Sequence, residues 1–177
     1  QNGEMYISNE GVNAKATLLK FPYIAVSEVA KQEIIKSGYN FSSPNEKMEL
    51  GKHLTEISGI AYVPSTGQML AEYDEKGDIF TIDFSKKNDL VGKVKFGGKG
   101  DYEDIVYTDT AVYMLLSPGI VSRVSTKDSS LATTEYNLGL SGTNEFEAMY
   151  LEGDGKSLIL LCKDCSKEKD EIRKAYR

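Results

Sequence analysis

The pattern of apolar and polar residues along this chain repeats, and each repeat opens with a similar segment that ends in an apolar run. The segment occurs three times, at residues 56–62, 101–107 and 145–151. Aligning the copies places Ser58, Glu103 and Glu147 in one column, with spacings of 45 and 44 residues. A period of this length is typical of the four-stranded blades of β-propellers. The pattern therefore predicts an all-β fold.

Further apolar runs follow each opening segment and predict the remaining strands of each blade. Second strands are expected at 69–71, 114–116 and 158–160, after turns rich in Gly, Pro or Asp. Third strands are expected at 78–84, 120–124 and 172–177, and half-exposed outer strands at 93–96 and 135–138. The repeats thus cover about 56–100, 101–144 and 145–177.

The chain holds about three blades, whereas propellers close with about four to eight. We divide it into an N-terminal leader, residues 1–38, and a partial propeller, residues 39–177. Residues 47–50 are interpreted as a lone outer strand, and residues 28–36 of the leader as a short helix. We expect that a C-terminal half is missing; the alternative is an open fragment that dimerises.

Composition and charge limit the classes of partner that this chain is expected to bind. The chain has 177 residues, 40% of them hydrophobic and 27% charged, which is typical of a globular domain. A net charge of −6 and a pI near 5.0 argue against nucleic acid, which binds basic surfaces. No apolar run reaches the length of about 18 residues that a transmembrane helix needs.

The candidate chemistry lies in two columns of aligned acidic residues in the opening segments. One column contains Glu103 and Glu147, and the other, two residues earlier, contains Glu56, Asp101 and Glu145. Equivalent residues of successive inner strands face each other across the central channel of a propeller. The five carboxylates would therefore converge near one mouth of the channel, where a cation would relieve their mutual repulsion. Oxygen-only ligands favour calcium or magnesium over zinc or iron. The predicted ligands are Glu56, Asp101, Glu103, Glu145 and Glu147.

Two other interpretations of these carboxylates stay open. They could accept backbone hydrogen bonds between blades without any metal, or they could be catalytic. Asp104 and Asn144 flank the columns and could serve any of these roles. Asp74, Glu75 and Asp78 are interpreted as a solvated hairpin tip around Gly77.

The two cysteines, Cys162 and Cys165, follow an apolar run that reads as a buried strand. A zinc site would need more Cys or His ligands at suitable spacing, and the single histidine, His53, is over a hundred residues away. We favour unpaired structural thiols. A disulfide in an oxidising compartment and a catalytic role are the alternatives.

Several blocks of residues 39–177 together resemble a known family. The most specific are Gly-Asp-Tyr-Glu-Asp-Ile at 100–105 and Asn-Glu-Phe-Glu at 144–147. In this respect the chain is similar to the SdiA-regulated family, the YjiK-like proteins of bacterial cell envelopes. The resemblance implies an exported or lipid-anchored β-propeller with no settled biochemical activity; an anchoring cysteine would lie outside this chain.

The sequence favours a non-enzymatic propeller of the cell envelope that binds an unidentified small molecule or protein partner, with a calcium ion at the acidic columns. The alternative is a calcium-dependent hydrolase that resembles propeller phytases or lactonases. Such an enzyme needs basic groups near the acidic mouth to bind an anionic substrate. The candidates for that role are Lys52, His53, Lys99 and Lys163.

Overall fold

The computed structural model describes residues 3–9, 16–23, 39–51, 54–86, 90–127, 131–140, 143–165 and 174–177, and these residues form strands, turns and loops without a helix. The strands, in chain order, are β1 (Glu4–Asn9), β2 (Thr17–Pro22), β3 (Glu46–Glu49), β4 (Ile60–Val63), β5 (Gln68–Tyr73), β6 (Lys76–Ile82), β7 (Leu90–Lys99), β8 (Tyr102–Thr108), β9 (Ala111–Leu116), β10 (Ile120–Ser125), β11 (Thr133–Asn137), β12 (Asn144–Leu151), β13 (Leu158–Cys165) and β14 (Ala175–Tyr176). The part of the chain that the structure describes has no helix with the length and apolar character needed to cross a bilayer.

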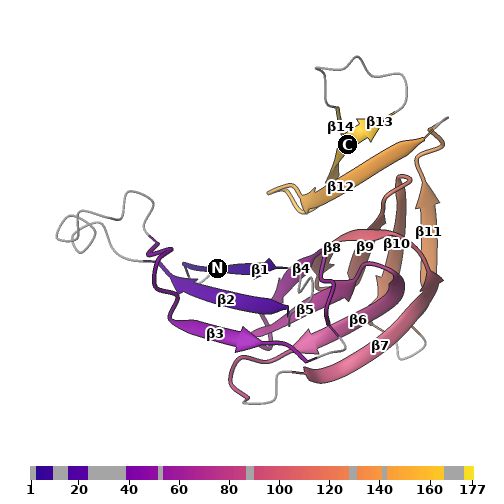
Figure 1. Ribbon diagram of the computed structural model, residues 1–177. Helices are drawn as coiled ribbons and strands as arrows, with labels where there is room; N and C mark the ends of the chain where they lie inside the picture. The colour runs from indigo at the N-terminus through magenta and orange to yellow at the C-terminus, as the bar shows by residue number, and fades with distance from the viewer. Residues whose placement is uncertain are drawn as a thin grey trace.

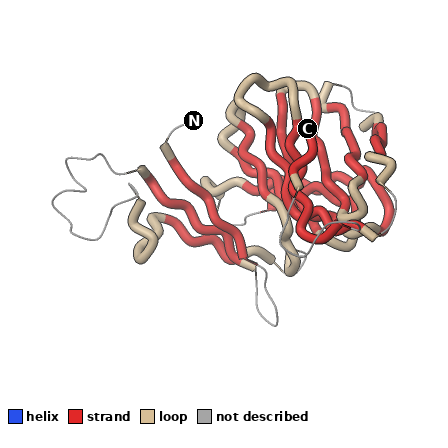
Figure 2. The backbone as a smooth tube through the Cα atoms, turned by 90° about the horizontal axis from the view of Figure 1, so that it is seen from above, coloured by secondary structure: helices blue, strands red, loops and turns tan. Residues whose placement is uncertain are grey.

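The strands form four antiparallel sheets, each built from strands that are consecutive in the sequence. The sheets are β1-β2-β3, β4-β5-β6-β7, β8-β9-β10-β11 and β12-β13-β14. They follow one another around an arc (Figure 1), and seen from above the first sheet lies to one side of the other three (Figure 2). The predicted all-β propeller architecture, incomplete in this chain, is confirmed by this succession of blade-like meanders.

Apolar side chains fill the space between each sheet and the next. Strand β5 shows how: Met69 and Ala71 point into the core shared with the first sheet, while Leu70 points into the core shared with the third. Successive residues of a strand point to opposite faces, so one strand supplies both cores. A third core, around Leu115 and Phe146, joins the last two sheets.

The first strand of each later sheet lies next to the first strand of its neighbour. Strand β8 contacts both β4 and β12, so these strands form the inner edge of the arc. Backbone hydrogen bonds repeat along this edge. The N–H of Tyr102 donates to the Asp74 carbonyl at 2.7 Å, and the N–H of Phe146 donates to the Ser117 carbonyl at 2.9 Å. The acidic columns of the sequence therefore lie on the inner edge, as expected.

The interpretation of residues 47–50 as a lone strand is wrong. Strand β3 pairs with β2, and β2 pairs with β1, so two strands of the predicted leader complete a three-stranded sheet. Leu18 of β2 is fully buried in the core that this sheet shares with β5 and β6. The boundary drawn at residue 38 thus falls inside one sheet. The helix predicted at 28–36 lies outside the described residues.

Candidate functional site

The column that contains Glu103 and Glu147 coincides with a β-bulge on the inner edge. Tyr102 and Asp104 pair with consecutive residues of β9, which leaves Glu103 as the extra residue of β8. Glu147 is likewise the extra residue between Phe146 and Ala148 of β12. A bulge turns the side chain of its extra residue away from the regular pleat. In the first repeat Ser58 precedes β4, which begins only at Ile60.

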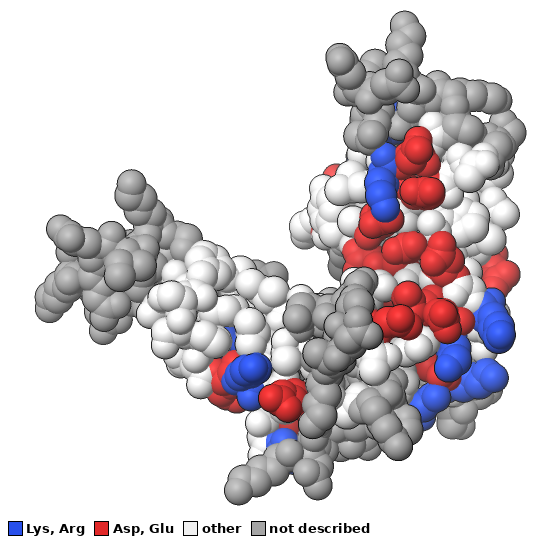
Figure 3. Space-filling view, viewed as in Figure 1, with Lys and Arg blue, Asp and Glu red and all other residues white. Residues whose placement is uncertain are grey.

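Six carboxylates gather along the inner edge, and we call them the acidic band. Burial, together with the nearby charges of Glu147 and Asp101, raises the pKa of Glu103 to about 7. Burial also raises the pKa of Asp74, with added effects from Glu56 and Asp101. Figure 3 shows acidic side chains in a column on the side of the molecule that faces its hollow. The acidic band consists of Glu56, Asp74, Asp101, Glu103, Glu145 and Glu147.

One ammonium group is already held on the acidic band. Nζ of Lys163 lies 2.8 Å from Glu147 Oε1 and 3.9 Å from Glu145 Oε2, and these carboxylates raise the pKa of the lysine. Glu56 accepts a hydrogen bond of 3.0 Å from the Tyr73 hydroxyl. The structure therefore brings all five predicted site residues onto one edge. Among the described residues, however, no three Asp, Glu, His or Cys side chains are arranged to hold a metal ion.

A carboxylate that accepts a backbone hydrogen bond between blades is found at Asp104 and not in the acidic columns. Its Oδ2 accepts the N–H of Met149 at 2.7 Å, from the next sheet, and its Oδ1 accepts the N–H of Ile105 at 2.8 Å. Burial raises the pKa of Asp104, while these two bonds act to lower it. Gly59 packs directly against Asp104, since a Cβ there would lie 2.9 Å from its Cα. Asp104 therefore has a structural role.

Sequence reasoning missed Glu72, a fully buried carboxyl behind the acidic band. Neither of its oxygens has a hydrogen-bond partner among the described residues. Burial raises its pKa well above the usual range, as do the charges of Asp104, Glu103 and Asp74. A buried and unpaired carboxyl is unusual in a protein interior and marks a functional candidate.

Asp74 and Glu75 form the turn between β5 and β6, as expected, but the prediction that Asp74 and Asp78 are solvated is wrong. Asp78 is 4% exposed, and its Oδ2 lies 2.7 Å from Nζ of Lys93. Oδ1 of Asp74 is buried without a hydrogen-bond partner in the described part of the chain, and the Asp74 carbonyl accepts the N–H of Tyr102, from β8 of the next sheet. Both residues face protein because β6 pairs with β7 right after the turn. Glu75 is exposed, as expected.

Cys162 and Cys165 form a disulfide, with Cα atoms 6.1 Å apart, and not the pair of free thiols that we favoured. Residues three apart in a regular strand point to opposite faces. The bulge opposite Glu145 and Phe146 leaves Lys163 as an extra residue, so both cysteines face the same core. The alternation of apolar and polar residues did not reveal this bulge.

The sequence and the structure were also compared with known proteins. No family model and no curated protein matches the sequence, so the resemblance to the SdiA-regulated family stays a prediction. Among solved structures, the β-propeller domain of Cps50 (Swd1) from Myceliophteria thermophila is similar, with a TM-score of 0.47 and 10% identity. The match covers 89% of this chain and 45% of that one, so this chain spans less than half of that domain.

Proposed function

We propose that this chain is a non-enzymatic β-propeller domain that binds a ligand or protein partner through cationic groups received by the acidic band. The observation that carries the proposal is the ammonium of Lys163, which sits on Glu147 and Glu145. The adjacent Asp101 and Glu103 have no ion pair among the described residues. An ammonium or guanidinium group of a ligand would bind there as Lys163 does.

The buried Glu72, behind the acidic band, also supports the proposal. An isolated carboxyl in the interior lowers stability, and the sheet packing does not require it. The charges that raise its pKa are those of Asp104, Glu103 and Asp74, of which the last two belong to the acidic band. A bound cation would stabilise the ionised forms of Glu72, Glu103 and Asp74.

A hydrolase of the phytase or lactonase type is supported less well. It would need free basic groups to bind an anionic substrate. Lys163, one of the four candidates for that role, is engaged by Glu147 and Glu145. Lys52 and His53 lie outside the described residues, and Lys99 is exposed at the end of β7.

Calcium remains a competing occupant of the band. The donors are all oxygens, which suits calcium or magnesium. Among the described residues, however, no three of these carboxylates are arranged to hold a metal ion. We therefore propose an organic cation as the main ligand and keep calcium as a separate outcome of the binding experiment.

A place in the cell envelope is part of the proposal. The disulfide between Cys162 and Cys165 supports it, because disulfides persist in oxidising compartments such as the periplasm. The resemblance to envelope proteins points in the same direction.

We expect a fluorescent pentalysine peptide to bind this chain at low salt, with Kd increased about fivefold by Glu103→Gln, in line with the loss of one partly exposed charge pair. Because the pKa of Glu103 is about 7, affinity should rise as pH increases from 6 to 8, while this carboxyl ionises. The variant should lose this part of the pH dependence. Fluorescence anisotropy measures both effects.

The matched control is Glu135→Gln, which removes one exposed carboxylate from β11, outside the band. Equal losses in the two variants would mean that the peptide responds only to net charge, and the proposal would fail. Addition of calcium or magnesium chloride at matched ionic strength separates the occupants. Displacement by calcium alone would favour a calcium site over an organic cation.

A further inference from the structure

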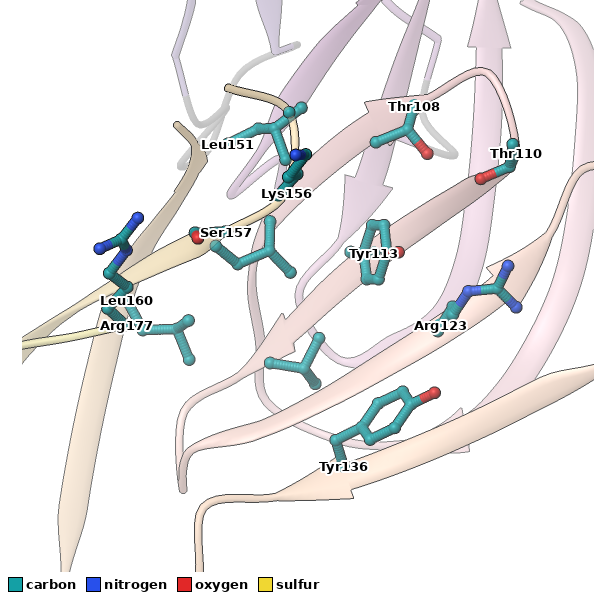
Figure 4. A pocket seen from close by; sticks show the side chains of 13 residues that line it. Thr108, Thr110, Tyr113, Arg123, Tyr136, Leu151, Lys156, Ser157, Leu160 and Arg177 are labelled. Atoms are coloured by element: carbon teal, nitrogen blue, oxygen red, sulfur yellow. The ribbon is translucent and has the colours of Figure 1, made fainter. Parts of the chain in front are cut away.

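A cavity of about 560 Å³ lies between the second four-stranded sheet and the last sheet. Tyr113, Arg123 and Tyr136 line it from one side, and Lys156 and Leu160 from the other (Figure 4). Small-molecule sites usually have volumes of about 300–1,000 Å³. The lining residues do not include any member of the acidic band, so the cavity is a separate site.

The strand register explains how these side chains meet. Arg123 of β10 lies directly opposite Tyr113 of β9, and Tyr136 of β11 lies opposite Val121 of β10. Cross-strand neighbours share a face of a sheet. This is the face that contributes Val121 to the core shared with the last sheet. The cavity is therefore the place where that core gives way to larger polar side chains.

The preceding sheet fills the equivalent positions differently. Leu70 and Thr81 form the same cross-strand pair there, and Leu70 is buried in the core. Tyr113 and Arg123 replace them in the sheet β8-β9-β10-β11. Packing of one blade on the next thus works with small and apolar residues at these positions. An arginine and a tyrosine are not needed to hold the sheets together.

The charge of the lining is opposite to that of the protein. The cavity contains three basic residues and no Asp or Glu, although the chain has a net charge of −6. Arg177 is paired with Glu152 at 2.8 Å and lies 3.9 Å from Asp154. Arg123 and Lys156 have no ion pair within the described part of the chain. Two basic groups are therefore available to a ligand.

We propose that this cavity binds a small organic anion, with a carboxylate or phosphate group held by Arg123 and Lys156 and an apolar body packed on Tyr113, Tyr136 and Leu160. The planar guanidinium of arginine matches two oxygens of either anionic group. Tyrosine rings and leucine side chains offer the apolar contact that such sites combine with a few polar groups. This site goes beyond the binding of cations at the inner edge.

The test is isothermal titration of the whole chain with 2-naphthoate, 2-naphthyl phosphate and the uncharged 2-naphthalenemethanol. We expect at least one of the two anions to bind at least about tenfold more tightly than the alcohol, because the loss of a charge-assisted pair to arginine is of that order. The tighter of the two anions identifies the preferred group. Equal affinity for all three probes, or no binding of either anion at 10 mM, would overturn the proposal.

Variants locate the site. Arg123→Gln and Lys156→Gln should each weaken binding of the preferred anion about tenfold, as expected for one charged hydrogen bond. Lys156 is exposed, so its replacement leaves the fold intact even if Arg123→Gln is harmful. Lys127→Gln, on an exposed bend after β10 and outside the lining, is the charge-matched control. Equal losses in Lys156→Gln and Lys127→Gln would contradict the assignment.

Discussion

Replacement of Glu72 by leucine is expected to raise the free energy of unfolding at pH 7 by about 3 kcal/mol, the combined effect of removing a buried ionisable group and burying apolar surface. The strand register supports this substitution. Glu72 stands opposite Ile79 just as Leu115 stands opposite Val121 in the next sheet. Leu115 is fully buried there, so leucine fits this position of a blade.

The effect of Glu72→Leu should depend on pH, with a sign fixed by the raised pKa of the carboxyl. The folded protein keeps Glu72 protonated at pH values where the unfolded chain has already released that proton. Stability is therefore full below the unfolded pKa of about 4.5 and falls as pH rises, by about 1.4 kcal/mol per pH unit, until the folded pKa is reached. Glu103 adds a second decrease up to a pH of about 7.

Urea unfolding of the wild type and of Glu72→Leu between pH 4 and pH 8 measures this difference. The two stabilities should diverge as pH rises, and the variant should retain only the slope that comes from the acidic band. Glu72→Gln is the control, because it removes ionisation but keeps a buried polar group. Its free energy of unfolding at pH 7 should lie between those of the wild type and Glu72→Leu. A variant that is less stable than the wild type at pH 7 would mean that Glu72 is ionised and compensated in the folded protein.

The same substitution links stability to the proposed function. If a cation at the acidic band stabilises the ionised form of Glu72, the pentalysine peptide should raise the Tm of the wild type more than that of Glu72→Leu. If Glu72→Leu raises the free energy of unfolding but reduces the increase in Tm caused by the peptide, the carboxyl of Glu72 has a role in binding. Sites of this kind commonly lower the stability of the protein that carries them.

The sequence predicted the repeating sheets because their apolar runs are local signals. It missed Glu72 because the first hairpins of the two repeats differ in length. Four residues, 64–67, connect β4 to β5, whereas two, Asp109 and Thr110, connect β8 to β9. Alignment by apolar runs therefore matched Leu70 with Leu115, two positions away from the true equivalent.

The first sheet and the role of Asp104 were not predicted for a different reason. Both depend on contacts between residues that are far apart in the sequence. Strand β1 has no repeat motif and is held by β2, which in turn pairs with β3 more than twenty residues later. Asp104 and Met149 are 45 residues apart in the sequence, and nothing local indicates that they are bonded. The acidic columns were predictable because the repeat itself aligns them, whereas their exact partners were not.

Asp104→Ala is expected to lower the free energy of unfolding by about 3 kcal/mol, because hydrogen bonds to a charged acceptor contribute about 1.5–3 kcal/mol each. The substitution removes the acceptor of two backbone N–H groups, those of Ile105 and Met149. Ile105 and Met149 are themselves buried in successive cores, so water cannot replace the carboxylate without opening the inner edge. Urea unfolding and amide hydrogen exchange measure the loss.

Two further variants separate this role from a general effect of charge. Asp104→Asn keeps one acceptor oxygen, so it should lower the free energy of unfolding by about half as much as Asp104→Ala. Asp101→Ala, at an exposed position three residues earlier, should change the free energy of unfolding by less than about 0.5 kcal/mol. The exchange of the Met149 amide should accelerate in Asp104→Ala far more than in Asp101→Ala. Equal effects at Asp101 and Asp104 would contradict the assignment.

Because the bond to Met149 fixes β12 against β8, its loss in Asp104→Ala should also separate Glu147 from Glu103. The pKa of Glu103 should then move down from about 7, toward its ordinary value.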